Sequence, residues 1–429
     1  MANITVTASC LCKALSFSTP PLPPSALPLK SSSCHCTSCR HVTGALRSSD
    51  AEWPGPPGEI QQALADAAGE SGGKGAGLRR YRHSERVGVL FCGVCGAGLF
   101  FEERDEEAEG GVRYSVFTGA LSGVVSEGEG EVPVLVRCED HIFVGDTVDG
   151  GAVCWLRGMN GEGDEGPPVR VWLGARGASE EVPPGVRWPA LESLLGYEVG
   201  LKTAEGDRGN VPVRCHCGGV DLVLRAGELQ REFEEMQKKG EELPFLVDPV
   251  THKMLASLDA CESCRRCAGS ELCNWTFSLL RHISFAAGDE AGGFPQSTAE
   301  LKTAVEGTEG KRRDPRFGTL AFYISSPTVQ RYFCGRCSAQ VFYAVDSRPD
   351  LVDIAVGLLD SPDGARAESV LSWSFGGTTS WMQDMVGTWR EPLWRAALKE
   401  VEEWRIARGY PKNWHRVARE QQAEQSGGK

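Results

Sequence analysis

Residues 89–103 read VLFCGVCGAGLFFEE, and a closely similar stretch, RYFCGRCSAQVFYAV, occupies residues 331–345. In both, a CxxC motif is flanked by aromatic and aliphatic residues at alternating positions. Alternation with a period of two is typical of β-strands, and cysteines at this spacing are typical of a tetrahedral metal site. Each stretch therefore predicts two short strands joined by a metal-binding turn.

The other motifs indicate that the whole plan of the first half is repeated. A CxC motif followed by alternating apolar residues occurs in ASCLCKALSF at residues 8–17 and again in VRCHCGGVDL at residues 213–222. In each half a central cysteine cluster comes next, and the CxxC motif comes last. A single CxxC is weak evidence, but an ordered set that occurs twice indicates duplication. We expect a mainly β fold of two tandem zinc-binding domains with irregular loops.

The composition between the repeats indicates the domain boundaries. Residues 155–210 are rich in Gly, Pro and acidic residues, as is typical of a linker. We expect a first zinc domain over residues 5–157, a linker over 158–210, a second zinc domain over 211–385, and a C-terminal helix and tail over 386–429. The helix has apolar residues at helical spacing and should pack on the second domain.

Composition and charge narrow the classes of function. The chain has 429 residues, with 45 Lys and Arg against 58 Asp and Glu, and a formal net charge of -13 at pH 7. This charge would repel a phosphate backbone or an anionic membrane, so we expect neither nucleic acid nor membrane as a partner. No apolar run reaches the roughly 18 to 20 residues that cross a bilayer, and the first residues do not resemble a signal peptide. We expect a cytoplasmic protein, in which 17 cysteines indicate metal binding or catalysis rather than disulfides.

Seven cysteines of the first half divide into a set of four and a set of three. Two pairs far apart in sequence can clamp the fold around a closed, structural zinc site: Cys10, Cys12, Cys92 and Cys95. One short loop supplies the other three, which leave a fourth zinc position for water or another ligand: Cys34, Cys36 and Cys39. Alternatively, this second set takes its fourth ligand from His35, His41, Cys138 or His141 and is a second structural site. Iron–sulfur clusters and copper(I) are the alternatives to zinc.

A zinc ion with three thiolate ligands favours one kind of chemistry. The thiolates make it a poorer Lewis acid for water than a site of three neutral histidines, but a good host for a further soft ligand. An incoming thiol would bind as the thiolate and stay nucleophilic at neutral pH, so attack on a small aldehyde would follow. We therefore expect the set Cys34, Cys36 and Cys39 to be catalytic.

Three motifs of the first half, in this order, resemble a known family. The CxC near the start, CHCTSCRHVTG at residues 34–44 and FCGVCGAGL at residues 91–99 are similar to the glutathione-dependent formaldehyde-activating enzyme family, also called the centromere protein V or GFA domain family. The resemblance covers about residues 5–157 and includes HIFVGDTVDGG at residues 141–151, which looks like the family's closing strand. It implies a β-tent fold and the same division into a structural and an open zinc site.

The resemblance also implies a reaction. The family's activity is that of a carbon–sulfur lyase that condenses glutathione with formaldehyde to S-hydroxymethylglutathione, so a small thiol and a small aldehyde are the expected partners. Arg40 follows the last ligand of the open set and could meet a glutathione carboxylate, or it could be a counter-charge for the thiolates. His141 could orient a zinc-bound water or the substrate, or it could be packed and hydrogen-bonded in a strand.

The second half departs from the motif at its central cluster. DACESCRRCAG at residues 259–269 aligns with the first-half motif so that Asp259 falls where Cys34 stands, followed by Cys261 and Cys264. Either Asp259 or Cys267 could be the third ligand, so this site is altered and could be inactive.

The closed set of the second half is complete, and it consists of Cys215, Cys217, Cys334 and Cys337. We expect two zinc ions in the first domain and one or two in the second. We expect His216 and Cys273 to be packing residues.

Two other classes of function stay open beside the enzyme. A non-catalytic tandem zinc-binding interaction module is compatible with the duplication, the acidic surface and the change at Asp259. A thiol redox protein is the third class, because a CxxC motif can form a disulfide, but four-ligand zinc sites would sequester those thiols.

Overall fold

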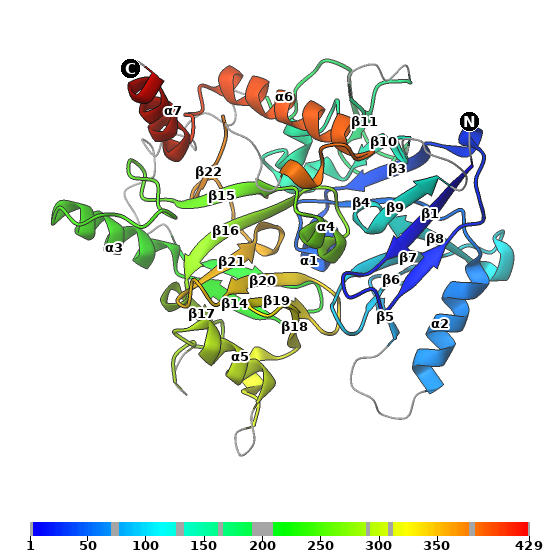
Figure 1. Ribbon diagram of the computed structural model, residues 1–429, viewed down its shortest axis with the longest axis horizontal. Coiled ribbons are helices and arrows are strands. Elements are labelled where there is room, and N and C mark those ends of the chain that lie inside the picture. The colour runs from blue at the N-terminus through cyan, green and yellow to red at the C-terminus, as the bar shows by residue number, and fades with distance from the viewer. Residues whose placement is uncertain are drawn as a thin grey trace.

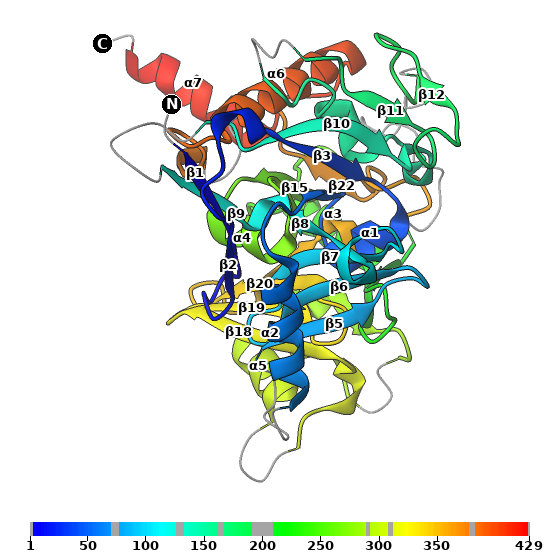
Figure 2. The same ribbon diagram turned by 90° about the vertical axis from the view of Figure 1, so that its right-hand side faces the viewer.

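The two cysteine repeats fold into two β-rich halves that lie side by side (Figure 1). The computed structural model describes residues 3–69, 77–125, 133–161, 166–190, 209–288, 292–307, 312–376 and 382–427. The first half is blue to cyan and the second half green to yellow, and the C-terminal helices, orange and red, lie along one side of the molecule (Figures 1 and 2). Within the described ranges, no helix is both long enough and apolar enough to cross a bilayer.

The first half contains a small sheet and a large sheet. The small sheet has the order β2-β1-β9, with bounds β1 (Ile4–Ser9), β2 (Ser16–Ser18) and β9 (Leu121–Val125). The large sheet has the order β12-β11-β10-β3-β4-β8-β7-β6-β5, with bounds β3 (Leu29–Cys34), β4 (Ser48–Glu52), β5 (Leu78–Arg82), β6 (Val87–Cys92), β7 (Gly98–Arg104), β8 (Val112–Phe117), β10 (Val136–Ile142), β11 (Arg170–Trp172) and β12 (Glu181–Val182). The helices are α1 (Thr37–Thr43) and α2 (Pro57–Gly69), with the 3-10 helices η3 (Thr118–Ala120) and η5 (Gly151–Trp155).

The second half repeats this division. Its small sheet has the order β13-β14-β17, with bounds β13 (Val211–Arg214), β14 (Asp221–Leu224) and β17 (Ile283–Phe285). Its large sheet has the order β18-β19-β20-β21-β16-β15-β22, with bounds β15 (Met254–Asp259), β16 (Cys273–Leu279), β18 (Leu320–Ser326), β19 (Val329–Cys334), β20 (Gln340–Val345), β21 (Leu351–Ala355) and β22 (Leu371–Trp373). Its helices are α3 (Ala226–Lys238), α4 (Glu262–Ala268) and α5 (Thr298–Glu306), with the 3-10 helix η9 (Val356–Leu358).

The order of the strands confirms the duplication. From its edge inward, the first large sheet runs β5-β6-β7-β8-β4-β3-β10, and the second runs β18-β19-β20-β21-β16-β15-β22. The two series correspond strand for strand, and each ends with a parallel pair, β10 on β3 and β22 on β15. Equivalent residues can therefore be assigned between the halves from the strand register.

The segment expected as a linker is partly structured. Strands β11 and β12 lie within residues 158–210, and β11 pairs in parallel with β10, so this part of the chain extends the first large sheet. Residues 162–165 and 191–208 of the expected linker lie outside the described residues. The periodicity of the sequence did not reveal these strands because they are only three and two residues long.

Helix α6 (Glu391–Arg408) begins and ends near the residues that the sequence indicates, and α7 (Trp414–Gly427) follows it. The sequence led us to expect that α6 packs on the second half, but it also contacts the first half. The Trp404 ring lies 6.0 Å from the Trp155 ring of η5, and Glu400 accepts a hydrogen bond from the Arg157 amide at 2.7 Å. Helix α6 therefore packs on both halves.

The central helices α1 and α4 each end against the opposite half. The Gly357 amide of η9 donates to the Gly44 carbonyl at 3.0 Å, and the Gly119 amide of η3 donates to the Gly269 carbonyl at 3.1 Å. Gly44 and Gly269 cap the two helices with φ of 80° and 72°, a backbone conformation that favours glycine. A Cβ on Gly44 would lie 2.4 Å from the Gln340 carbonyl oxygen, so glycine also permits this close approach. The halves are thus related by a local pseudo-twofold arrangement at their contact.

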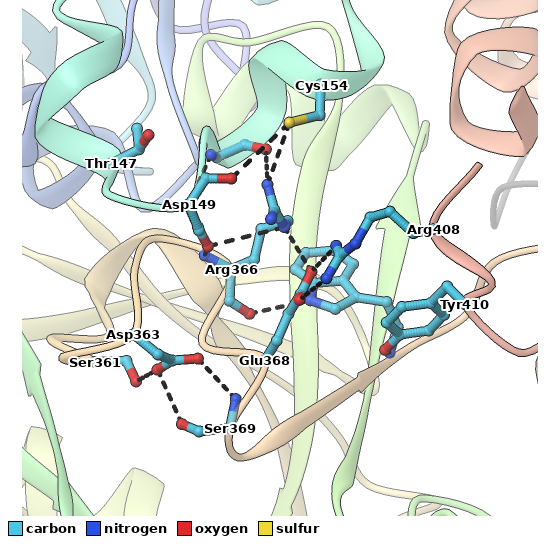
Figure 3. Close-up of polar contacts among 12 residues, drawn as sticks. Thr147, Asp149, Cys154, Ser361, Asp363, Arg366, Glu368, Ser369, Arg408 and Tyr410 are labelled. Carbon is cyan, nitrogen blue, oxygen red and sulfur yellow. Dashed lines mark hydrogen bonds and ion pairs between the residues drawn. The ribbon is translucent and has the colours of Figure 1, made fainter. Parts of the chain in front are cut away.

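A buried network of charged groups also joins the halves (Figure 3). The Asp149 carboxylate accepts from the Arg366 amide at 2.7 Å. Glu368 accepts from Arg366 Nε at 2.7 Å and from the Arg408 guanidinium at 2.8 Å. These four side chains are at most 5% exposed. The network therefore fixes α6 and the end of the first half onto the second half.

Candidate metal centres and the open thiolate site

A closed cluster of four thiols connects the small and large sheets of the first half, and it consists of Cys10, Cys12, Cys92 and Cys95. All four sulfur atoms lie within 4.8 Å of one another, and Cys12 Sγ is 3.5 Å from Cys10 Sγ and 3.6 Å from Cys92 Sγ. A tetrahedral zinc site with metal–sulfur distances of ~2.3 Å has sulfur atoms ~3.8 Å apart. Hydrogen bonds from Cys92 and Cys95 lower the pKa of Cys10, so the cluster stabilises a thiolate. The donor set and its spacing fit structural zinc.

The second half contains the equivalent closed cluster, which consists of Cys215, Cys217, Cys334 and Cys337. Cys217 Sγ lies 3.6 Å from Cys215 Sγ and 3.5 Å from Cys334 Sγ. Cys215 directly follows β13, and Cys334 and Cys337 lie at the end of β19 and in the turn to β20, as the equivalent cysteines do in the first half. This cluster fits a second structural zinc ion.

A third cluster brings together Cys34, Cys36 and Cys39, and we call it the open thiolate site. Strand β3 ends at Cys34, Cys36 caps helix α1, and Cys36 Sγ accepts a hydrogen bond from the Cys39 amide at 3.3 Å. Hydrogen bonds from Cys34 and Cys39 and this amide lower the pKa of Cys36. Among the described residues, the cluster of candidate ligand atoms contains no fourth member.

The residues considered as a fourth ligand have other contacts. His35 Nε2 lies 3.0 Å from His141 Nδ1, and His141 Nε2 lies 2.9 Å from the Leu156 carbonyl oxygen. Both rings are fully buried. His41 lies 3.2 Å from Asp360, and Cys138 is within 3.6 Å of the Asp140 carbonyl oxygen. His35 Nδ1 has no hydrogen-bond partner among the described residues, but neither it nor any ligand atom of the other three side chains belongs to the cluster. The open thiolate site therefore offers three candidate ligands.

His141 was also a candidate substrate contact. The structure places it in β10 with both ring nitrogens engaged, one by His35 and one by the Leu156 carbonyl. No ring nitrogen is left for a substrate. The contacts favour the packing role of His141.

Arg40 lies in α1 directly after Cys39 and is only 5% exposed. One guanidinium nitrogen donates to Thr37 Oγ1 at 3.2 Å, whereas Nε and the other terminal nitrogen have no hydrogen-bond partner among the described residues. The equivalent Arg265 of α4 donates to the carbonyl oxygens of Ala260 and Asp384, at 2.9 and 3.3 Å. Arg40 alone of the pair retains buried donors for a ligand.

Two histidines that the sequence did not indicate lie beside the open thiolate site. The rings of His83 and His216 have centroids 4.4 Å apart, and the negative charge of Cys36 acts on both. His83 follows β5, whereas His216 belongs to the CxC motif of the second half and donates its backbone amide to the His41 carbonyl at 3.0 Å. The expectation that His216 only packs is therefore incomplete, because it lies where the second half meets the open thiolate site. No local pattern could have shown this contact between segments 133 residues apart.

An arginine-lined cavity of about 620 Å³ adjoins His216. Its other lining residues are Arg79, Arg80, Tyr81, Arg82, Cys217 and Arg336. No carboxylate is among them, although the chain is acidic overall. Arg80 pairs with Glu102 at 2.7 Å, whereas Arg79, Arg82 and Arg336 form no ion pair among the described residues. The cavity is therefore suited to an anion.

The fourth cluster consists of Asp259, Cys261 and Cys264, so Asp259 rather than Cys267 occupies the third position. Burial and the charge of Cys261 raise the pKa of Asp259 to about 7. The Cys261 amide donates to Asp259 Oδ1 at 2.7 Å. Cys273 is buried in β16 and belongs to none of the four clusters.

The comparisons with known proteins agree with the geometry of the first half. The family model described as glutathione-dependent formaldehyde-activating enzyme matches residues 5–129. The match spans the first closed cluster and the open thiolate site, and it confirms the family resemblance over these residues. Neither the curated proteins nor the solved structures gave a match.

Proposed function

We propose that the open thiolate site holds a zinc ion and that the protein acts there on adducts of a small thiol with a small aldehyde. Glutathione and formaldehyde are the leading pair. The observation that carries the proposal is a cluster of three thiols with no fourth protein ligand among the described residues. Zinc bound there would keep an incoming thiol deprotonated at neutral pH. The match of residues 5–129 supports the same chemistry.

The reaction is a balanced addition that needs no oxidant or reductant. The sulfur of the thiol attacks the aldehyde carbon, and a carbon–sulfur bond forms. The carbonyl oxygen takes up the proton that the thiol gave up, which gives an S-hydroxymethyl product. The reverse reaction breaks the carbon–sulfur bond, as in a carbon–sulfur lyase.

Arg40 is the proposed contact for an acidic group of the thiol substrate. Its two unpartnered guanidinium nitrogens lie buried beside the last ligand of the site. A buried guanidinium binds a carboxylate strongly because the hydrogen bonds are charge-assisted. The arginine-lined cavity beyond His216 would hold a second carboxylate, and glutathione carries two.

We propose that His83 and His216 orient the substrate between the open thiolate site and the arginine-lined cavity. His83 Nδ1 is buried and has no hydrogen-bond partner among the described residues, so it can bind a polar group of the adduct. Tyr81 lies 2.7 Å from His216 Nδ1 and holds that ring in place. Because His216 comes from the second half, the active site would be complete only when both halves are folded together.

Thiol binding to the zinc-loaded, full-length protein tests the proposal, and isothermal titration with glutathione measures it. We expect binding in the wild type and its loss in Cys39→Ala. Cys264→Ala removes the equivalent cysteine of the second half and should retain binding. Absence of binding to a folded, zinc-loaded wild type would contradict the proposal and favour a non-catalytic interaction module.

The proposal also covers the bounds of the domains and the cellular location of the protein. We propose that the first zinc domain extends from residue 5 beyond residue 157, because β11 and β12 continue its large sheet. We propose that the second zinc domain comprises residues 211–385 and that the C-terminal segment comprises residues 386–429. All 17 cysteines are free thiols in the structure, which suits a reducing, cytoplasmic location.

A further inference from the structure

The second central cluster differs from the open thiolate site by more than Asp259. In the first half, Val89 of β6 lies opposite Tyr81 of β5 and Phe101 of β7. In the second half, Arg331 of β19 lies opposite Tyr323 of β18 and Tyr343 of β20. Arg331 is thus the equivalent of Val89. Both side chains are buried, with Val89 0% and Arg331 5% exposed.

The Arg331 guanidinium reaches the cluster directly. One terminal nitrogen donates to Cys264 Sγ at 3.5 Å, and Nε donates to Ser325 Oγ at 3.2 Å. The guanidinium carbon also lies 4.9 Å from the centre of the Tyr343 ring. Counted along the sequence from the equivalent residues Tyr81 and Tyr323, Ser325 corresponds to His83, although β18 has an irregularity between Ile324 and Ser326. The arginine side chain therefore reaches a thiol of the cluster from a strand position where the first half has the shorter side chain of Val89.

Arg331 also supplies positive charge to the cluster. Its positively charged guanidinium is buried and lies directly against Cys264 Sγ. An arginine side chain stays protonated in proteins and has no acceptor atom, so it cannot be a zinc ligand. A protein-bound zinc ion needs a fourth ligand, from the protein or from water, besides the three in this cluster.

We propose that the Arg331 guanidinium takes the place of a metal ion in the second central cluster, which is held together as a metal-free group of Asp259, Cys261, Cys264 and Arg331. Its side chain blocks the fourth ligand position and offsets part of the negative charge that the cluster can carry. The protein then binds three zinc ions, two in the first half and one in the second. The second central cluster is a structural copy without chemistry of its own.

Zinc content measured by mass spectrometry on the full-length protein, after loading with excess zinc and desalting, tests this proposal. We expect three zinc ions per chain in the wild type. Arg331→Val places the residue of the first half in the second and should raise the count to four. Arg331→Lys keeps a cation and should leave the count at three.

A second pair of variants keeps the test decisive if Arg331→Val does not fold. Cys261→Ser should leave the count at three, whereas Cys36→Ser in the first half should lower it to two. A wild-type count of four that falls to three in Cys261→Ser would overturn the proposal. The count does not depend on turnover, so this result is separate from the success or failure of the proposed function.

Discussion

The Tyr81 hydroxyl of the first half lies 2.7 Å from Nδ1 of His216, a residue of the second half's CxC motif. This contact brings the closed cluster of one half beside the open thiolate site of the other. Two small zinc domains could in principle be connected by a linker without contributing to each other's sites. Here the second half instead contributes a wall to the proposed active site of the first.

Tyr81→Phe should lower activity without unfolding the protein. The change removes a single, partly buried hydrogen bond, which contributes about 0.5 to 1.5 kcal/mol to stability. Because His216 would lose its orienting partner, we expect kcat/KM for the glutathione and formaldehyde reaction to fall about tenfold, which corresponds to about 1.4 kcal/mol. Tyr323→Phe changes the equivalent residue of β18 and should leave activity unchanged. Equal effects of the two variants would contradict a specific role for Tyr81.

Arg40→Met should weaken thiol binding more than it weakens the fold. The substitution removes the buried donors that have no protein partner, so few native hydrogen bonds are lost. We expect the dissociation constant for glutathione to rise at least tenfold, with a smaller effect on a thiol that lacks carboxylates, such as 2-mercaptoethanol. Arg265→Met, which breaks two hydrogen bonds to carbonyl oxygens, should instead destabilise the protein and retain thiol binding. An unchanged glutathione affinity in Arg40→Met would rule out the contact.

Glu368→Ala should destabilise the assembled halves strongly. It would leave Arg366 and Arg408 without their carboxylate in the buried network of Figure 3. Removing one partner of a buried pair typically costs about 3 to 5 kcal/mol. Glu402→Ala, which breaks the partly exposed pair between Glu402 and Arg405 within α6, should cost only about 1 kcal/mol. Urea unfolding of the zinc-loaded proteins measures both, and similar losses would contradict the structural role of the network.

The Glu368 carboxyl should make the free energy of unfolding depend on pH in the acidic range. Burial opposes ionisation of Glu368, but Arg366 and Arg408 outweigh it and lower its pKa from 4.5 to about 2. A depressed pKa in the folded state means that the stabilisation is fully present above the unfolded value and is lost as pH falls from 4.5 through about 2. Glu368→Gln should flatten this part of the pH profile of unfolding. An identical acid dependence in wild type and variant would assign the effect to other groups.

Substitution of single cysteines should distinguish the structural sites from the open thiolate site. The closed clusters hold the small sheet to the large sheet in each half, so Cys10→Ser should lower the thermal midpoint markedly and lose one zinc ion. Cys34→Ser removes a ligand of the open site at the end of one strand and should lose a zinc ion with a smaller change in the midpoint. Calorimetry and zinc analysis check both variants, and a larger loss of stability in Cys34→Ser would reverse the assignment.

The sequence predicted the parts of this molecule that are local or repeated. Spacing indicated all four thiol clusters, the strands around the CxxC turns and the C-terminal helix, and it left Asp259 and Cys267 as alternatives that side-chain geometry distinguishes. It did not indicate that His216 and Arg331 face central clusters, because those contacts come from the packing of one half on the other and from strand register. The strands β11 and β12 were too short for their periodicity to be recognised.

Exchange between free formaldehyde and its glutathione adduct, followed by NMR with the zinc-loaded protein, tests the central claim most directly. The account predicts exchange faster than the spontaneous rate, lost in Cys39→Ala and retained in Cys264→Ala. A spontaneous rate in the presence of the folded protein, with the open site shown to hold zinc, would contradict the claim that this site acts on the formaldehyde adduct of glutathione.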